Sequence, residues 1–347
     1  MSPATVAIIS FRLNGPDGVS IEAAKWADAF RSLGSRVVTV AGEGVADTIV
    51  PGLAMGDSSP PGVDEVEAAL EVADLVVVEN VCSLPLNRPA ADVVAKVLSG
   101  RAAILHHHDL PWQRSRDRDI SDFPPTDDSW CHVTINDLSR RQLAARGLPA
   151  TTIYNCFDVN AAGGDRFAAR TAMAVADGEI LLVHPTRAIP RKNVAGALRL
   201  AEAIGATYWL VGPAEDGFDS ELERLLEATS APCVRGLPLG LSIVDAYAAA
   251  DAVTLPSTWE GFGNATVESA IHRRPLAVGD YPVAAEIGAH GFHWFPADDA
   301  APLLEWLEAP DPGILDTNFA VARKDFSLDR LEASIAALLP AWGWRLA

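Results

Sequence analysis

The chain has 347 residues, of which 49% are hydrophobic and 21% are charged, a composition typical of a soluble globular protein with room for two domains. Its formal net charge of −19 argues against nucleic acid or an anionic membrane as a partner. No apolar run reaches the roughly 18 residues of a membrane span, and the N-terminus lacks a charged-then-apolar signal peptide, so we expect a cytoplasmic protein. The four scattered cysteines form no Cys-x-x-Cys pair and indicate free thiols in a reducing compartment.

Apolar segments alternate with helical segments through the first half of the chain. Residues 5–11 form a predicted strand, and the turn after it leads to Ser20, the expected N-cap of a helix that ends near Leu33. Strand, glycine turn, helix and strand in this order predict a Rossmann-like domain, although the Gly-x-Gly-x-x-Gly spacing of nicotinamide enzymes is absent. The other predicted strands cover residues 36–40, 74–79, 102–108, 131–136 and 151–154, and the other helices cover 63–72, 90–98 and 137–146.

The same alternation repeats in the second half. Residues 159–170, with an Ala-Ala-Gly-Gly run, predict a linker, and residues 328–339 predict the last helix. Two such α/β halves place a ligand cleft outside the carboxyl ends of their strands. The predicted strands cover residues 180–184, 207–211, 232–234, 252–256 and 276–278, and the helices cover 194–204, 219–228, 243–250, 265–273 and 300–308.

A glycine-rich turn after the predicted strand 252–256 carries the most informative residues. Gly261 and Gly263 let the backbone approach a ligand, and the helix that follows points unpaired N–H groups outward. Glu260 lies at the mouth of this turn and Glu268 lies about one helical turn inside. Two carboxylates would repel a phosphate, so the turn is predicted to bind the hydroxyls of a sugar and a ribose. Because a carboxylate at the mouth of a turn contributes little to packing, we expect replacement of Glu260 to leave the fold intact.

The run Glu260-Gly-Phe-Gly, with Glu268 eight positions after the first glutamate, resembles the hallmark of family 4 retaining glycosyltransferases (glycosyl transferases group 1). The resemblance implies the GT-B fold, in which two Rossmann-like domains face each other across a cleft and a C-terminal helix crosses back to the first. It implies an acceptor-side domain of residues 1–158 plus the C-terminal helix 326–347, and a nucleotide-sugar donor domain of residues 159–325. In that family the second glutamate binds the nucleotide ribose. By the same resemblance, the donor sugar is expected to be held by the catalytic Glu260 and the amides of Gly261, Phe262, Gly263 and Asn264.

Two cations after the first strand of the second half resemble the family's Arg…Lys element, which grips the donor diphosphate. Arg187 is the expected forked contact and Lys192 the expected point charge. Fixed cations at a helix N-terminus stabilise the charge that a leaving nucleoside diphosphate gains, so neither a metal ion nor another cofactor is expected. Arg191 is an ambiguous neighbour, and Asn193 replaces the family's usual glycine. Basic residues at a solvated helix start are the alternative.

The run from His106 to Asp109 offers three imidazoles and a carboxylate. Strand alternation turns His106 and His108 to one face and His107 to the other, which argues against a metal site. In the family, a histidine at the end of a first-domain strand contacts the donor sugar. The resemblance assigns this catalytic role to His108, with His107 as the donor-binding fallback if the register differs by one residue. Plain strand-end histidines and a structural metal are the alternatives.

The first loop and a later arginine-rich segment are expected to serve the substrates. Gly18 belongs to the loop that, in the family, helps to hold the donor phosphates or the acceptor. Arg12, Arg114 and Arg116 carry positive charge in an acidic protein, and with the N–H groups of the first helix start they predict a small, polar and anionic acceptor. The alternative is that arginines of the later segment pair on the surface with Asp117, Asp119 and Asp122.

Together these patterns predict a retaining, metal-independent hexosyltransferase that moves a hexose from a UDP- or GDP-linked donor to a hydroxyl of such an acceptor. They fix neither the donor base nor an oligomeric state. The alternatives are a nucleotide-sugar epimerase or a phosphorylase on the same fold, and a non-catalytic nucleotide-sugar-binding protein.

Overall fold

The computed structural model describes residues 3–15, 17–56, 59–114, 117 and 119–344. The chain forms two compact units: Met1–Cys156 with Leu328–Ala347 make up the first, and Phe157–Ser327 make up the second. The predicted domain boundaries at 158 and 326 each differ from these by two residues. None of the helices within the described ranges is long and apolar enough to cross a membrane.

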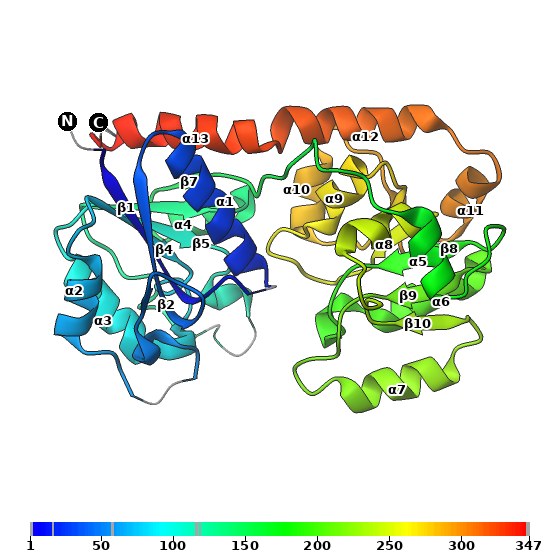
Figure 1. The fold of residues 1–347 in the computed structure, drawn as a ribbon, viewed down its shortest axis with the longest axis horizontal. Coiled ribbons are helices and arrows are strands. Elements are labelled where there is room, and N and C mark those ends of the chain that lie inside the picture. Colours follow the sequence, from blue (N-terminus) through cyan, green and yellow to red (C-terminus); the bar gives the residue numbers. More distant parts are fainter. Residues whose placement is uncertain (1–2, 16, 57–58, 115–116, 118, 345–347) are drawn as a thin grey trace. The chain divides into compact units, whose positions relative to one another are not determined.

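The first unit is built on a parallel sheet of seven described strands: β1 (Thr5–Leu13), β2 (Arg36–Gly44), β3 (Thr48–Ile49), β4 (Leu75–Glu79), β5 (Ala103–His107), β6 (Trp130–Thr134) and β7 (Ala150–Thr152). They lie in the order β3-β2-β1-β4-β5-β6-β7 (Figure 1). β1 therefore pairs with both β2 and β4, and the chain steps outward on each side, which is the strand order of a Rossmann-like domain. β4 is buried along its whole length because both faces of a parallel sheet are covered.

Helices cover both faces of this sheet. They are α1 (Gly18–Ser32), α2 (Val63–Leu70), α3 (Arg88–Leu98), α4 (Asp137–Ala144) and α13 (Leu328–Ala341), with short 3-10 turns η1 (Pro51–Leu53), η2 (Pro85–Asn87) and η3 (Pro111–Gln113). Alternate residues of β1 divide between two cores: Ile8 packs with Trp26 of α1 and Ile335 of α13, whereas Ile9 packs with Leu70 of α2 and Val94 of α3. The last helix thus packs on the first unit, as the resemblance implies (Figure 1).

The first helix begins at Gly18, three residues before the start expected with Ser20 as its N-cap. Asp17, and not Ser20, is its N-cap: the Asp17 carboxylate accepts hydrogen bonds from the backbone N–H of Ser20 at 3.1 Å and from its hydroxyl at 2.8 Å. Aspartate caps a helix well because its carboxylate satisfies the unpaired N–H groups of the first turn. Arg12 donates to the same carboxylate at 3.1 Å, so a charge of the protein itself already occupies this helix start.

The second unit is built on a parallel sheet of six described strands: β8 (Leu181–His184), β9 (Thr207–Leu210), β10 (Cys233–Arg235), β11 (Ala252–Leu255), β12 (Leu276–Val278) and β13 (Phe295–Pro296). Their order is β10-β9-β8-β11-β12-β13, again with the first strand at the centre (Figure 1). Leu182 of β8 faces one core and Leu181 and Val183 face the other, so this sheet too is buried on both sides. Both halves therefore have the predicted α/β architecture.

The helices of the second unit include several that we did not predict. They are α5 (Arg166–Ala172), α6 (Val194–Ile204), α7 (Asp219–Ala228), α8 (Ile243–Ala249), α9 (Ala265–Ile271), α10 (Pro282–Gly288), α11 (Ala301–Glu308) and α12 (Pro312–Asp325), with the 3-10 turn η5 (Pro190–Lys192). The predicted linker 159–170 is wrong from Asp165 onward, because Asp165 caps α5 by accepting from the N–H of Ala168 at 2.9 Å. Helix α5 packs against α8 and belongs to the core of this unit.

Candidate functional site

The glycine-rich turn joins β11 to α9, as the sequence predicts. Gly263 has φ +89°, and a Cβ atom there would lie 2.4 Å from the hydroxyl of Tyr281, so only glycine fits. Phe262 is buried and its ring lies 6.1 Å from those of both Phe157 and Phe326, so its side chain belongs to the core and only its backbone is available to a ligand. The turn with Gly261 and Asn264 thus has the strand–turn–helix setting that a sugar-binding role requires.

Glu260 is the centre of a cluster that also contains the buried Lys192 and Ser257 and the partly exposed Arg191. Its carboxylate is 4% exposed. Oε1 accepts hydrogen bonds from Lys192 Nζ and from Ser257 Oγ, both at 2.5 Å, and Oε2 accepts one from Arg191 Nη1 at 2.5 Å. Burial alone would raise the pKa of Glu260, but the charges of Lys192 and Arg191 lower it below its usual value, so the carboxylate is ionised at neutral pH.

This cluster corrects one expectation from the sequence. A buried carboxylate paired with two cations does contribute to stability, because its removal leaves Lys192 and Arg191 without their anion. Burial already lowers the pKa of Lys192, and the charge of Glu260 counteracts that shift. Replacement of Glu260 is therefore not expected to leave the fold untouched.

The loop between β8 and α6 positions both cations. Lys192 is buried at the end of η5, and Asn193 follows with a left-handed backbone (φ 52°, ψ 54°) that turns the chain into α6. This explains how asparagine stands where the family usually has glycine, since both residue types tolerate that conformation. The Asn193 side chain donates to the carbonyl of Pro256 at 3.1 Å, which ties this loop to the Glu260 turn.

Arg187 and Arg191 have different partners in the structure. Arg187 is 45% exposed and pairs with Glu215, itself 41% exposed, at 2.5 Å. Arg191, which the sequence left ambiguous, contacts Glu260 and also donates to the carbonyl of Trp259 at 2.9 Å. Of the two predicted diphosphate-binding residues, the structure therefore brings Lys192 to Glu260 and pairs Arg187 with another acid.

Glu268 has a fixed orientation that the sequence did not reveal. The hydroxyl of Tyr247 in α8 donates to Glu268 Oε2 at 2.6 Å, and the Tyr247 ring stacks on His272 at 4.9 Å. Tyr247 is fully buried, so it holds the carboxylate from the core side. Its position 21 residues from Glu268 explains why no local pattern indicated the contact.

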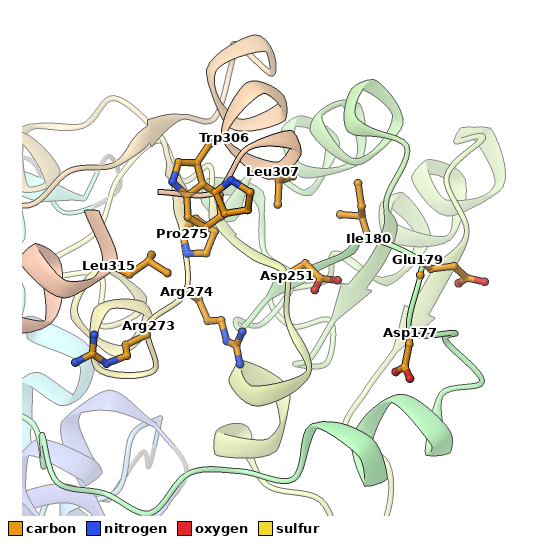
Figure 2. Close-up of a pocket in the computed structure, with 12 residues that line it drawn as sticks. Asp177, Glu179, Ile180, Asp251, Arg273, Arg274, Pro275, Trp306, Leu307 and Leu315 are labelled. Carbon is orange, nitrogen blue, oxygen red and sulfur yellow. The ribbon is translucent and has the colours of Figure 1, made fainter. Parts of the chain in front are cut away.

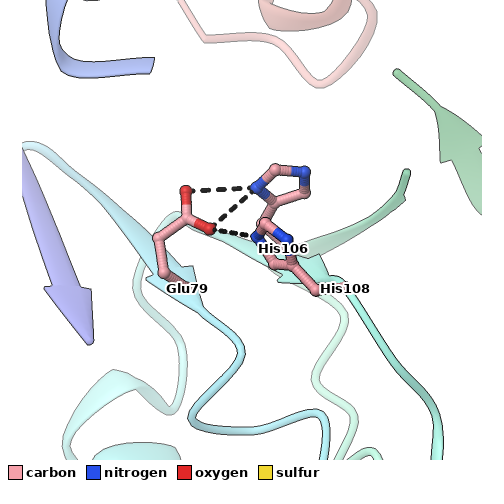
Figure 3. A group of neighbouring side chains, drawn as sticks. All are labelled: Glu79, His106 and His108. Carbon is pink, nitrogen blue, oxygen red and sulfur yellow. Dashed lines mark hydrogen bonds and ion pairs between the residues drawn. The ribbon is translucent and has the colours of Figure 1, made fainter. Parts of the chain in front are cut away.

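The side chains of His106, His107 and His108 point alternately to the two faces of the sheet, as predicted. His106 Nδ1 and His108 Nε2 both lie against Glu79 Oε2, at 2.9 and 2.8 Å (Figure 3). His107 faces the other way, with Nδ1 2.6 Å from the Ser83 hydroxyl and Nε2 2.9 Å from His132 Nδ1. Both ring nitrogens of His107 thus have partners in the core. This geometry favours His108, which is 7% exposed, over His107 as a residue that could reach a ligand.

Glu79 is the residue that sequence reasoning missed in the first unit. Glu79, His106 and His108 offer ligand atoms that all lie within 4.8 Å of one another, the one group of this kind in the described part of the chain. Burial alone would raise the pKa of Glu79, but His106 and His108 lower it to about 2, so the three side chains form a charged hydrogen-bonded cluster. A cation would have to replace these short hydrogen bonds. The metal-free site therefore stays our prediction.

Three buried histidines predict that mild acid destabilises the protein. Burial lowers the pKa of His107 well below 6.5, that of His132 to about 4 and that of His184 to about 3. In the unfolded chain each would bind a proton near pH 6.5, so each contributes stability that is complete above this pH and is lost as the pH falls toward its folded pKa. The loss is about 1.4 kcal/mol per histidine and pH unit. Burial also lowers the pKa of His106, which adds to the loss of stability. Burial would lower the pKa of His108 as well, but Glu79 raises it, so the proton bound to His108 opposes the loss.

Urea unfolding at pH 7 and pH 5 measures this dependence. We expect the free energy of unfolding to fall by about 5 kcal/mol between these pH values, and the fall to be about 2 kcal/mol smaller in His132→Gln. Equal stability of the wild type at both pH values would contradict the assignment of neutral, buried histidines.

The predicted acceptor residues all have acidic partners where they are described. Arg12 pairs with Asp17 at 3.0 Å, next to Gly18. Arg114 pairs with Asp109 at 2.6 Å, and not with the three aspartates predicted as its alternative partners. Arg116 lies outside the described residues. Of the N–H groups expected at the start of α1, that of Ser20 is used by the Asp17 cap.

The second unit also has a cavity of about 340 Å³ (Figure 2). It is lined by residues that precede the strands, among them Asp177, Asp251 and Arg274, and by Trp306 of α11. Asp251 precedes the amino end of β11, whereas Glu260 follows its carboxyl end. The cavity therefore lies at the amino ends of the strands, and the predicted donor residues lie at the carboxyl ends. The cavity is therefore separate from the Glu260 cluster.

Comparisons with known proteins bear on the family and on the fold. Residues 186–308 match the family model described as "Glycosyl transferases group 1", which confirms the resemblance seen in the sequence. Mannosylglucosylglycerate synthase of Petrotoga mobilis is 26% identical to this chain, and the match covers 80% of this chain and 83% of the relative. The enzyme of the same name from Thermotoga maritima is 24% identical, and the match covers 94% of this chain and 97% of the relative. The solved structure of Anabaena HepE with UDP-glucose has a TM-score of 0.77 and 18% identity, and covers 97% of this chain and 99% of that one. The GT-B fold class is confirmed.

Proposed function

We propose that this chain, whose residues 186–308 are those of a group 1 glycosyl transferase, moves a hexose from a UDP- or GDP-linked donor to a hydroxyl of a small anionic acceptor, with retention at the anomeric carbon. Glycosyl transfer from a nucleotide sugar is the part that the family match and both relatives support. The donor base, the retention and the anionic acceptor are the finer parts of the proposal.

The observation that carries the proposal is the cluster of Glu260, Lys192 and Arg191 beside the glycine-rich turn, inside the matched residues. In the proposed complex the cations hold the donor diphosphate, and Glu260 with the backbone of Gly261 to Asn264 holds the hexose. Glu268 takes a ribose hydroxyl, for which its fixed carboxylate is suited.

The proposed reaction replaces one bond at the anomeric carbon by another on the same face. The bond from this carbon to the diphosphate oxygen breaks, and the acceptor hydroxyl oxygen bonds to the carbon from the side that the diphosphate leaves. The hydroxyl proton passes to the departing phosphate oxygen. Lys192 and Arg191 stabilise the charge that develops on the diphosphate, which is why we propose that no metal ion is needed.

The acceptor class is suggested by the relatives. Both are named for the synthesis of mannosylglucosylglycerate, whose glycerate part carries a carboxylate. We propose the same kind of acceptor here, a small polar molecule that carries a carboxylate. Arg114 and Arg116 are the proposed contacts, and Arg114 would exchange Asp109 for the acceptor carboxylate.

A comparison of acceptors tests this proposal. Glucosylglycerate, glycerate and 3-phosphoglycerate should be glycosylated with KM values at least tenfold below those of neutral sugars. The double variant Arg114→Ala/Arg116→Ala should raise the KM of the anionic acceptors about tenfold, as expected for the loss of a charged hydrogen bond of roughly 1.5–3 kcal/mol. The matched control Arg31→Ala, which removes an arginine from the exposed pair with Asp28, should change nothing. Neutral acceptors that work best, with an unaffected double variant, would refute an anionic acceptor.

A further inference from the structure

The Glu260 carboxylate is largely occupied before any substrate binds. It accepts from Lys192 and Ser257 through one oxygen and from Arg191 through the other, all at 2.5 Å. A carboxylate offers about four lone-pair sites, so three of them are in use. The same carboxylate cannot keep all these partners and also accept the hydroxyls of a bound hexose.

Lys192 and Arg191 likewise cannot bind Glu260 and a donor diphosphate without competition between the two anions. A donor diphosphate held by Lys192 must compete with Glu260 for the same ammonium group, which is 11% exposed. A buried ammonium such as that of Lys192 needs an anion beside it in every state of the protein. Exchange of one anion for another satisfies this condition, whereas simple addition of a diphosphate beside Glu260 would crowd like charges together.

We propose that Arg191, together with Lys192, binds the donor diphosphate, and that Glu260 holds both cations in place until the diphosphate replaces it and releases its carboxylate to the hexose. The inference rests on the proposed nucleotide-sugar donor. It makes Glu260 a positioning residue for the cations before donor binding, and a sugar-binding residue afterwards. It also adds Arg191 to the diphosphate site.

The local backbone supports Arg191 in this role. Its carbonyl accepts from the N–H of Thr258 at 2.9 Å, and its guanidinium donates to the carbonyl of Trp259, so the arginine is fixed against the Glu260 turn. Arg187, by contrast, lies in an exposed pair with Glu215, a type of interaction that contributes little. A guanidinium beside an ammonium gives the forked and the point-charge contact that a diphosphate accepts.

Calorimetric titration with UDP and GDP in EDTA tests the exchange. The nucleotide that the wild type binds more tightly is then titrated into Glu260→Gln and Arg191→Gln. Glu260→Gln should bind it at least tenfold more tightly, because the competing anion is gone. Arg191→Gln should bind it at least tenfold more weakly, while the affinity for the corresponding nucleoside stays within about twofold in both variants.

Two matched variants separate exchange from a general change of charge. Glu215→Gln removes a carboxylate from the exposed pair with Arg187, and Arg199→Gln removes an exposed cation of α6. Both should bind the diphosphate within about threefold of the wild type. Circular dichroism shows whether Glu260→Gln folds. If it does not, the Arg191→Gln titration alone decides, since Glu260 keeps Lys192 as a partner in that variant.

The titrations distinguish a failure of the proposed donor class from a failure of the proposed exchange. If neither UDP nor GDP binds to the wild type, the proposed donor class is wrong. If the wild type binds and Glu260→Gln binds equally or more weakly, or Arg191→Gln binds equally, the exchange is overturned and the donor proposal stands. A control that shifts as much as Glu260→Gln or Arg191→Gln would likewise overturn it.

Discussion

Replacing Glu260 with alanine is expected to lower the rate of glycosyl transfer by about 10²–10³, the loss of roughly 2.7–4 kcal/mol that follows removal of one well-placed polar contact at a reacting centre. The structure adds a second effect, because the buried Lys192 and the partly exposed Arg191 are both left without this anion. Breaking such a buried pair costs about 3–5 kcal/mol of stability. We therefore expect a variant that is both less active and less stable.

Steady-state kinetics and urea unfolding of the same preparation measure the two effects. A saturating nucleoside diphosphate should restore part of the stability of Glu260→Ala, because it supplies the missing anion. Glu215→Ala is the matched control, since Glu215 also pairs with an arginine but is 41% exposed. Normal turnover by folded Glu260→Ala would refute the role of this residue.

Replacement of Arg170 with alanine is expected to destabilise the second unit by about 3–5 kcal/mol. Arg170 is 2% exposed. Its guanidinium donates to Asp251 and to the carbonyl of Ala249, both at 3.0 Å, and to the carbonyls of Ala176 and Glu179 at 2.5 and 2.6 Å. These bonds join α5 to the end of α8 and to the start of β8, so their loss leaves the buried carbonyl of Ala249, two partly buried carbonyls and the Asp251 carboxylate with one donor fewer.

Urea unfolding followed by circular dichroism measures this loss. Arg199→Ala removes an exposed arginine of α6 and should change the free energy of unfolding by less than about 0.5 kcal/mol. A loss below about 1 kcal/mol in Arg170→Ala would show that the guanidinium is not needed to join these elements.

The sequence predicts those strands and helices that have a recognisable local pattern of apolar residues. Buried parallel strands such as β4 are short apolar runs, and helices such as α6 have an apolar face that recurs every three to four residues. The short helix α10 begins at a proline and contains two alanines and a glycine, so no amphipathic stripe indicates it. Helix α5 follows an Ala-Ala-Gly-Gly run that predicts a flexible segment, and its stability comes from Arg170, whose partners lie up to 81 residues away.

The residues of the candidate site likewise divide into those that a local sequence pattern predicts and those that only the structure reveals. Glu260, Lys192 and Glu268 were predicted because each lies in a recognisable local pattern, and the structure places the first two in direct contact. Arg191, Tyr247 and Glu79 have no such pattern. Their partners are 69, 21 and 27 residues away in the sequence, so only the packing of the sheets reveals them. The protonation of His107 and the partner of Arg114 depend on three-dimensional neighbours in the same manner.

Retaining glycosyl transfer is tested most directly by proton NMR of the product formed from an α-linked UDP- or GDP-hexose and glucosylglycerate in the presence of EDTA. We expect an α-linked product that forms only when the acceptor is present and at a rate that EDTA does not change. A β-linked product, conversion of the donor to another nucleotide sugar without an acceptor, or activity that EDTA abolishes and Mn²⁺ restores would contradict a retaining, metal-independent transferase.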